Sequence, residues 1–196
     1  MLDFGKNQLF FFAVLGLLAL QRLLELRYSR ANEAWMRRRG GREHAARQYR
    51  MMVLLHLSWF VAMLVEVVFW QRPFSRALFV VGVVGLLAGQ LLRYLAIFTL
   101  GRRWSVRVYT LPGRPPVLRG VYRYVRHPNY LGVIFEIASV PLLHGAWLTA
   151  GIYTVLNLIL IVRRVRAEEN ALERDNNYAR AFEPVGRFLP LSRANG

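Results

Sequence analysis

The fold is decided by the stretch SRALFVVGVVGLLAGQLLRYLAIFTL, residues 75–100. Its only charged side chains are Arg76 and Arg93, and a helix needs about 20 mostly apolar residues to cross a bilayer. The stretch therefore predicts a membrane-spanning helix. Its three glycines leave a side-chain-poor stripe that favours close packing against another helix; they are Gly82, Gly85 and Gly89. No predicted strand precedes them, so a dinucleotide-binding loop is not expected.

Two earlier stretches meet the same length criterion, Gln8–Leu26 and Tyr49–Trp70. The first lacks an A-x-A cleavage site and is followed directly by arginines, so we expect a retained span rather than a signal peptide. Later in the chain, Tyr130–Leu143 and Ala146–Val162 are shorter apolar stretches separated by a histidine and a glycine. They predict a helical hairpin that either crosses the bilayer thinly or is re-entrant.

These stretches predict an all-α integral membrane protein. We expect about five transmembrane helices, with a C-terminal helical hairpin and a cytoplasmic C-terminal helix. The sequence has no internal repeat and no low-complexity linker, so residues 1–196 are expected to form a single membrane domain.

The charges of the chain are segregated from its apolar stretches. Although 55% of the residues are hydrophobic, the formal net charge is +16, and most arginines lie in three segments, 27–50, 102–126 and 163–193. Cytoplasmic loops of membrane proteins are enriched in arginine and lysine, so all three segments are expected in the cytoplasm. Five crossings with the N-terminus outside satisfy this condition. If the hairpin is re-entrant and does not cross, the number of crossings is still odd, and the three segments stay in the cytoplasm.

The composition also excludes several kinds of chemistry. The chain has no cysteine, which rules out disulfides, thiolate nucleophiles and Cys-ligated metal centres. With four histidines in all, we expect no metal site. The pI of about 11.4 is also typical of nucleic-acid-binding proteins, but the arginines abut apolar stretches and match no nucleic-acid-binding motif. We therefore expect membrane lipids, and no nucleic acid, as partners.

Three ionisable residues lie inside apolar stretches, each about seven residues from the cytoplasmic end. They are His56, Arg93 and Glu136, and at 1.5 Å per residue their depth is roughly 10 Å. Since an isolated charge in lipid costs several kcal/mol, they are expected to share an interior pocket. The alternative is a structural Arg93–Glu136 pair. Gln90, one turn from Arg93, is a further member, whereas Glu66 near the outer face is expected to be a solvated helix end.

Two motifs point to the chemistry of the chain. The first is RHPNYLG, residues 126–132, and the second is RRVRAEENAL, residues 163–172. In this order and at this spacing they resemble the R-H-P-x-Y-x-G and E-E-x-x-L elements of the isoprenylcysteine carboxyl methyltransferase family of membrane enzymes. The resemblance covers about Leu91 to Pro190, and we interpret residues 91–190 as the catalytic half of the chain.

The resemblance implies that S-adenosylmethionine is the cofactor and is held on the cytoplasmic side. By position, the expected cofactor-binding residues are Arg107, Arg114, Pro115, Pro116, Val117, Tyr122, His127, Pro128, Asn129, Tyr130 and Glu168. The expected catalytic residues are Arg164, which faces the acceptor, together with Glu168 and His127. The expected substrate pocket comprises Arg164, Arg93, Glu136 and His56.

The residue types fit these roles on physical grounds. Arg164 and Glu168 are four positions apart, so they share one face of a helix. A carboxylate there can accept hydrogen bonds from ribose hydroxyls or from an ammonium group. His127 precedes a proline, which is favoured in the first turn of a helix, and the free N–H groups of that turn can bind a carboxylate. Tyr122 and Tyr130 can pack on adenine or face a sulfonium.

Two observations count against this interpretation. The arginines of residues 163–166 could simply mark a cytoplasmic stop, with Glu168 and Glu169 on a solvated helix face. The chain also has Ala181 where many family members have an aromatic residue, and Phe182 is one position away. The presence of RHPNYLG together with the second motif favours the cofactor site.

The acceptor is left open by the residues. A carboxylate acceptor is already ionised and needs only orientation by Arg164, whereas a phenol or enol needs a base, for which His127 and Glu169 are candidates. The loop LPGRPP, residues 111–116, resembles bacterial-type members that include methylators of long-chain alkyl pyrones and phenols. We therefore expect O-methylation of a lipophilic small molecule or a prenylcysteine-type carboxylate, in a bacterial cytoplasmic membrane with the site facing the cytoplasm.

Two other functional classes share some of these features. Membrane sterol-type C=C reductases, which use NADPH, also carry an R-H-P-N-Y-L-G element, but they are longer and end in a different charged motif. A non-enzymatic membrane subunit or transporter would also contain broken helices, but a cytoplasmic cluster of Arg, His, Tyr and Glu fits that class less well.

Overall fold

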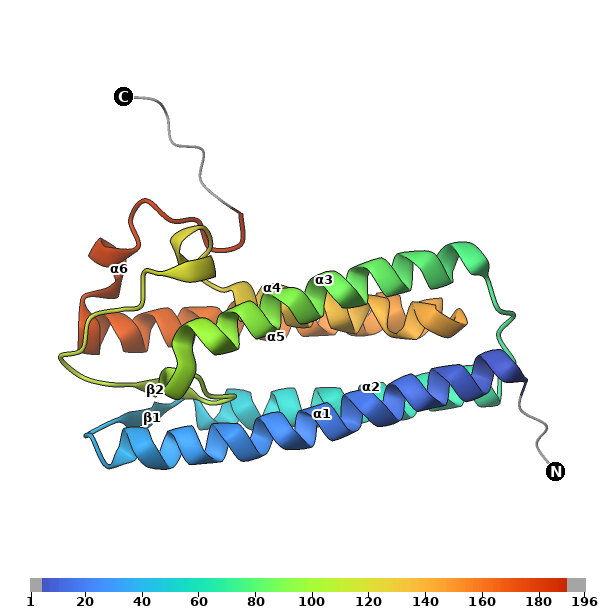
Figure 1. The fold of residues 1–196 in the computed structure, drawn as a ribbon, viewed down its shortest axis with the longest axis horizontal. Helices are drawn as coiled ribbons and strands as arrows, with labels where there is room; N and C mark the ends of the chain where they lie inside the picture. The colour runs from blue at the N-terminus through green and yellow to red at the C-terminus, as the bar shows by residue number, and fades with distance from the viewer. Residues whose placement is uncertain (1–4, 190–196) are drawn as a thin grey trace, which may run out of the picture.

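A computed structural model describes residues 5–189 of the chain. Long helices lie side by side along one axis and form a bundle (Figure 1). The helices of the bundle are α1 (Lys6–Arg37), α2 (Ala46–Val68), α3 (Arg76–Leu100), α4 (Pro128–Ser139) and α5 (Trp147–Asn176). Among residues 5–189, four helices are long and apolar enough to cross a membrane: α1, α2, α3 and α5. The predicted helical membrane fold is confirmed.

Most of the remaining elements gather at one end of the bundle, on the left in Figure 1. Two three-residue strands, β1 (Arg42–His44) and β2 (Val108–Thr110), pair in antiparallel register there. The other short elements at this end are the 3-10 helices η1 (Gly101–Arg103) and η2 (Gly120–Arg123) and the one-turn helix α6 (Tyr178–Ala181). The described parts of all three arginine-rich segments therefore lie at the same end of the molecule.

Helix α1 continues 11 residues beyond the expected span, and this extension has a polar buried face. Asn32 Nδ2 donates to the backbone oxygen of Trp104 at 2.8 Å, and the backbone N–H of Val106 donates to Ser29 Oγ at 3.0 Å. These bonds satisfy backbone groups that would otherwise be buried without partners. The extension thereby fixes the segment that follows α3, which leads to the site.

The glycine stripe of α3 packs against α4, as predicted. A Cβ atom on Gly89 would lie 2.9 Å from the backbone oxygen of Gly132, and one on Gly82 would lie 2.9 Å from that of Ser139. Contacts this short leave no room for a side chain at these positions unless the helix backbones move apart. The two helix backbones can approach closely only because the stripe has no side chains.

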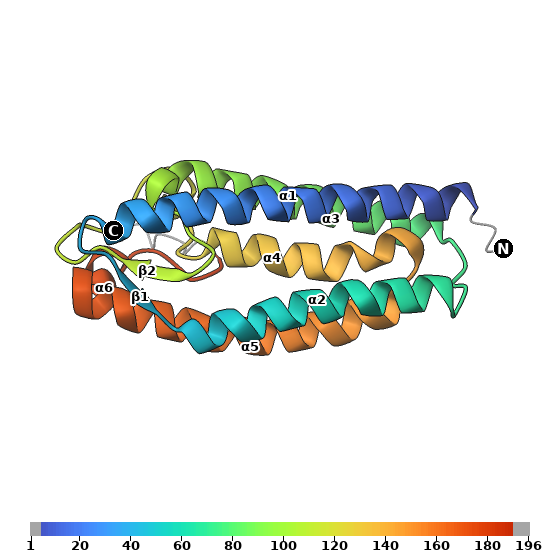
Figure 2. The ribbon, with the colours of Figure 1, turned by 90° about the horizontal axis from the view of Figure 1, so that it is seen from below.

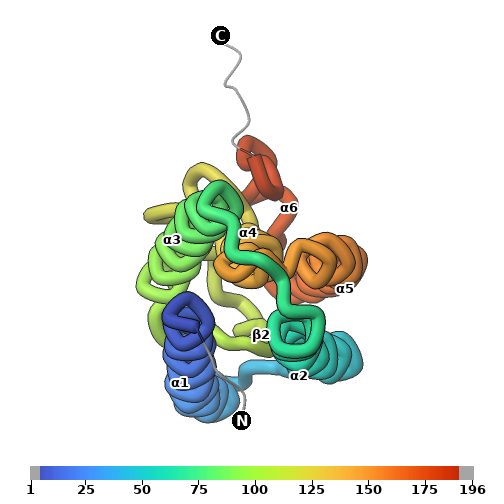
Figure 3. The backbone as a smooth tube through the Cα atoms, turned by 90° about the vertical axis from the view of Figure 1, so that its right-hand side faces the viewer, coloured from blue at the N-terminus to red at the C-terminus, as the bar shows by residue number. Residues whose placement is uncertain are grey.

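The hairpin consists of α4, the 3-10 helix η3 (Pro141–His144) and α5, and its turn reaches the far end of the bundle. A Cβ atom on Gly145, in the turn, would lie 2.8 Å from the backbone oxygen of Pro73, in the connection between α2 and α3. The first arm of the hairpin, α4 with η3, thus reaches the same end of the bundle as the longer helices beside it. Figure 3, viewed along the bundle, shows α4 beside α3 and α5.

Glu66 corrects one sequence-based expectation. Instead of being a solvated helix end, it is 2% exposed and accepts hydrogen bonds from the Thr149 backbone N–H at 2.7 Å and hydroxyl group at 2.6 Å. Arg72 Nε donates to the same carboxylate at 3.2 Å. The first N–H groups of a helix lack partners within the helix, and a carboxylate satisfies them favourably. The need to cap α5 explains why this charge is buried.

The apolar core joins α1, α2, α4 and α5 towards the far end of the bundle. Its most deeply buried members include Phe11, Met63, Val67, Ile137 and Val140. Towards the arginine-rich end, α1 and α2 are separate in the view from below (Figure 2). Side chains of both helices line a cavity there.

Candidate cofactor and substrate cavity

A buried charge network lies between α1, α3 and α4. Arg93 Nε lies 3.3 Å from Glu136 Oε1, which confirms the expected proximity of these two residues. Arg93 also donates to Glu25, and Arg22 bridges Glu25 (2.5 Å) and Glu136. Gln90 joins through its amide hydrogen bonds with Gln21. Two arginines and two glutamates make the network neutral, which makes its burial tolerable.

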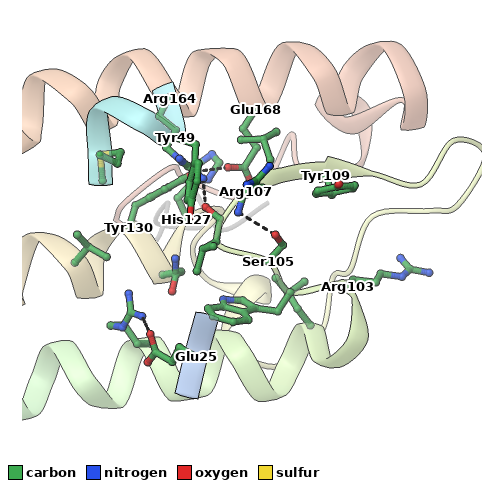
Figure 4. Close-up of a pocket in the computed structure, with 18 of the residues that line it drawn as sticks. Glu25, Tyr49, Arg103, Ser105, Arg107, Tyr109, His127, Tyr130, Arg164 and Glu168 are labelled. Carbon is green, nitrogen blue, oxygen red and sulfur yellow. Dashed lines mark hydrogen bonds and ion pairs between the residues drawn. The ribbon is translucent and has the colours of Figure 1, made fainter. Parts of the chain in front are cut away.

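One cavity of about 780 Å³ extends from this network to the arginine-rich end. Its apolar half lies between α1 and α2 and is lined by Ala19, Leu23, Leu26, Val53, Leu57 and Phe60. Its polar half lies under the β1–β2 ribbon and the loop at residues 111–117. Figure 4 shows Tyr49, Tyr130, Arg164 and Glu168 gathered on one side of the cavity, with Glu25 across from them.

A chain of hydrogen bonds connects residues on this side of the cavity. The hydroxyl group of Tyr130 accepts from Arg164 Nε at 2.7 Å and donates to Glu168. Arg164 Nη2 also donates to the backbone oxygen of Val106. Arg164 and Glu168 do lie on one face of α5, as their spacing predicted, and Tyr130 on α4 links them. Arg164 is 4% exposed, so these partners fix the orientation of its guanidinium.

His127 is the N-cap residue of α4, although its side chain makes no capping hydrogen bond, and Pro128 is in the first turn as expected. His127 Nε2 lies 3.1 Å from Glu169 Oε1, and Glu169 in turn accepts from Arg187 Nη2 at 2.7 Å. The backbone N–H of His127 donates to the Arg187 oxygen at 3.1 Å. The C-terminal segment therefore closes over the histidine, and both candidate bases from the sequence are paired with each other.

The loop between β2 and η2 is held against the end of α5. Asn176 Nδ2 donates to the backbone oxygens of Leu111 (2.7 Å) and Arg114 (2.6 Å), and Arg103 Nη1 donates to that of Pro115 (2.8 Å). These bonds keep the prolines of the loop at the rim of the polar half. The loop is thus a fixed wall of the cavity.

Arg107, just before β2, reaches towards the N-terminal part of the chain. Its Nη1 lies 2.8 Å from Glu43 Oε1, and its guanidinium carbon lies 4.7 Å from the centre of the Tyr49 ring. The pKa of Arg107 is raised by these contacts with Glu43, although partial burial opposes the rise. It therefore remains a cation at the cavity wall.

Tyr122 and Tyr178 lie beside Glu168 in a second apolar cluster, with Phe182. Burial, followed by the negative charge of Glu168, raises the pKa of Tyr122 well above its usual range, and the same two causes raise the pKa of Tyr178. Both rings are thus neutral. Phe182 is 2% exposed and its ring centre lies 4.5 Å from that of Tyr178, so it supplies a buried aromatic next to Ala181.

Most residues expected at the site from the sequence line this one cavity. They are Arg107, Arg114, Pro115, Pro116, Val117, Tyr122, His127, Asn129, Tyr130, Arg164, Glu168, Arg93 and His56. Two expected residues do not line it. Pro128 packs within the first turn of α4, and Glu136 lies behind Arg93 in the charge network.

Several residues of the cavity wall were missed by the sequence analysis. Tyr49 begins an apolar stretch, where an aromatic residue carries no distinguishing signal. Arg22 and Glu25 are charged residues within the first span, so the rule that selected Arg93 also applies to them. Trp104 and Ser105 follow α3 in a segment without any motif, and only their packing against α1 brings them to the cavity.

The bundle and its cavity define a polytopic helical membrane protein with a cavity that opens towards its arginine-rich end. The model of the isoprenylcysteine carboxyl methyltransferase (ICMT) family matches residues 80–174. The chain is 32% identical over 164 residues to the Bacillus subtilis (strain 168) protein YpbQ, a match that covers 83% of this chain and 96% of YpbQ. The chain belongs to the ICMT family.

Two eukaryotic relatives extend this comparison. A probable protein-S-isoprenylcysteine O-methyltransferase of Oryza sativa subsp. indica is 28% identical over 115 residues, covering 57% of this chain and 60% of the plant protein. The solved structure of a eukaryotic intramembrane Ras methyltransferase, ICMT, matches with a TM-score of 0.55 and 23% identity, covering 72% of this chain. This chain spans about half the length of that structure, 53% of which is covered. The likeness confirms the ICMT-like membrane fold.

Proposed function

We propose that this protein is an integral membrane O-methyltransferase that uses S-adenosylmethionine and acts on a lipophilic acceptor. The observation that carries the proposal is the single cavity, in which a polar half and an apolar half meet at Arg164, Tyr130 and Glu168. Methyl transfer to a lipid-like acceptor needs this combination because its cofactor is polar and its acceptor is not. Membership of a family with methyltransferase relatives supports the same activity.

The polar half offers groups that suit the cofactor. Asn129 Oδ1 is buried in the cavity wall and has no hydrogen-bond partner among residues 5–189. A buried acceptor without a partner costs free energy, so a donor on a bound ligand would stabilise it. The Glu168 carboxylate can accept from ribose hydroxyls or from an ammonium group, and the neutral ring of Tyr122 can pack on adenine. When bound, S-adenosylmethionine supplies an electrophilic methyl group on its sulfonium.

The apolar half offers a place for an alkyl or prenyl chain. Leu23 on α1 and Leu57 on α2 both line the cavity, yet 63% and 61% of their surfaces are exposed. We expect an acceptor to enter between these helices from the bilayer and to reach Arg164 with its polar end. Alignment of the reacting atoms supplies much of the rate of an in-line transfer. Arg164, held by Tyr130 and Val106, can orient the acceptor oxygen.

A calorimetric titration separates this proposal from the reductase alternative. Purified protein in detergent is titrated with S-adenosylhomocysteine and, separately, with NADPH. We expect the first to bind and the second not to bind. Transfer of a radiolabelled methyl group to N-acetyl-S-farnesylcysteine or to a long-chain alkylphenol then tests the chemistry. Binding of NADPH without binding of S-adenosylhomocysteine would refute the proposal.

A further inference from the structure

His56 is a basic side chain of the cavity wall whose role is not yet assigned. It lies on the face of α2 that also presents Tyr49, Met52 and Val53 to the cavity. Seven residues separate it from Tyr49, which corresponds to about 10 Å along a helix. Tyr49 is at the polar half beside Arg107, so His56 is placed towards the junction with the apolar half.

The hydrogen bond of the His56 ring fixes its tautomer. Nδ1 lies 2.7 Å from the backbone oxygen of Met52. A carbonyl oxygen only accepts, so Nδ1 must carry the hydrogen, and Nε2 of the neutral ring then has a free lone pair. Nε2 has no hydrogen-bond partner within residues 5–189. In this tautomer Nε2 is the ring atom that can accept a proton.

The other basic groups near the reaction centre are already engaged. His127 Nε2 is paired with Glu169, and Glu169 is paired with Arg187. Glu168 accepts from Tyr130. Of the two histidines that line the cavity in the described chain, His127 is held at Nε2 by Glu169 beneath the C-terminal segment, whereas His56 lies on α2, whose Val53 and Leu57 line the apolar half.

The charges around His56 suit a developing negative charge on an acceptor. The guanidinium groups of Arg22, Arg93 and Arg164 all interact electrostatically with His56, and they come from α1, α3 and α5. Arg22 and Arg93 are neutralised by Glu25 and Glu136, so Arg164 is the cation that would attract an acceptor oxygen lying between it and His56 as the oxygen loses its proton. A carboxylate acceptor needs no base, so a free imidazole at this position favours a hydroxyl acceptor.

We propose that His56 is the general base of the transfer and that Nε2 takes the proton of a phenolic or enolic lipid acceptor. The inference rests on the proposed function. As the O–H bond breaks, its electron pair stays on the acceptor oxygen and the proton moves to Nε2. The oxygen forms a bond to the methyl carbon while the S–C bond breaks, and that electron pair returns to sulfur. The products are the methyl ether, S-adenosylhomocysteine and an imidazolium, which then releases its proton to water.

The test compares two acceptors with the same alkyl chain. One is a long-chain alkylphenol, and the other is its ring-nitrated derivative, assayed at a pH where only the nitrophenol is ionised. His56→Asn keeps a donor for the Met52 oxygen but removes the base. General base catalysis contributes about 10²–10⁴-fold, so transfer to the alkylphenol should fall at least about a hundredfold. Transfer to the ionised nitrophenol and affinity for S-adenosylhomocysteine should change little.

Two further variants control for structural damage. His144→Asn removes another buried histidine, one that packs on Phe11 and Phe74 and does not line the cavity, and it should leave the ratio of the two rates unchanged. His56→Gln is made in parallel and should also lose transfer to the alkylphenol, because an amide is not a base.

The outcomes distinguish the inference from the proposed function. Equal losses on both phenols with S-adenosylhomocysteine binding retained, or full activity of both His56 variants on the alkylphenol, would overturn the role of His56. Wild-type protein that binds S-adenosylhomocysteine and methylates N-acetyl-S-farnesylcysteine but neither phenol would also overturn it, and would leave the proposed function standing. Absence of both binding and transfer in the wild-type protein would refute the proposed function as well.

Discussion

Glu168 accepts a hydrogen bond from Tyr130 and lines the polar half of the cavity, so its charge is available to a ligand. Glu168→Gln keeps the shape of the side chain and removes the charge. We expect the affinity for S-adenosylhomocysteine to fall by about 1.5–3 kcal/mol, the range for a hydrogen bond to a charged group. Calorimetry in detergent measures this difference directly.

The matched control is Glu183→Gln, which removes the same charge from an exposed side chain outside the cavity. Its affinity should equal that of the unmodified protein. If Glu168→Gln binds S-adenosylhomocysteine as tightly as the control does, Glu168 does not contact the cofactor.

The placement of a residue could be predicted from the sequence where it depends only on residues close to it in the chain. His127 and Pro128 start a helix, and Arg164 and Glu168 share a helix face, because both properties depend on spacing alone. Glu66 was misjudged because its partner, the start of α5, is about 80 positions away in the chain. Pairings that depend on how helices pack cannot be derived from one stretch of sequence.

At the scale of the helices, the α3–α4 contact depends on the absence of a side chain at Gly89. A Cβ atom there would lie 2.9 Å from the Gly132 oxygen, which is backbone and cannot rotate away. We expect Gly89→Ala to destabilise the protein by about 1–3 kcal/mol, as overpacking typically does. A lowered thermal midpoint in detergent would register this loss.

Gly16→Ala is the control for this substitution. A Cβ atom at Gly16 meets nothing within 4 Å, and alanine is the better helix former by about 1 kcal/mol. The thermal midpoint of this variant should therefore hold or rise. Equal effects of the two substitutions would show that the stripe of α3 is not a packing surface.

The elements themselves differed in how well they could be predicted. The four helices long and apolar enough to cross a membrane followed from apolar length, and the glycine stripe followed from spacing, whereas the number of spans, expected to be about five, stays a prediction. The β1–β2 ribbon was missed because strands of three residues are too short to show a period of two. The extension of α1 to Arg37 was missed because its buried face is polar, with Ser29, Asn32 and Glu33 bonded mainly to groups of the segment after α3 and to one another.

At the scale of the whole molecule, the basic end of the bundle coincides with the polar half of the cavity. The arginine-rich segments lie at the end of the bundle that holds the polar half of the cavity. The opposite end holds the connection at residues 69–75 and the turn of the hairpin, which are close together. One end of the bundle is therefore strongly basic and the other is not. From this asymmetry we expect the basic end to face the cytoplasm.

The orientation can be measured with single cysteines because the chain contains none. Gln71 is exposed in the connection between α2 and α3, and Glu183 is exposed at the arginine-rich end. Since arginine-rich segments are retained in the cytoplasm, a membrane-impermeant maleimide should label Gln71→Cys in intact cells. Glu183→Cys should be labelled only after the membrane is permeabilised, and the unmodified chain serves as the blank. The opposite pattern would place the polar half of the cavity outside the cytoplasm, where S-adenosylmethionine is not made, and would contradict the proposed function together with the topology.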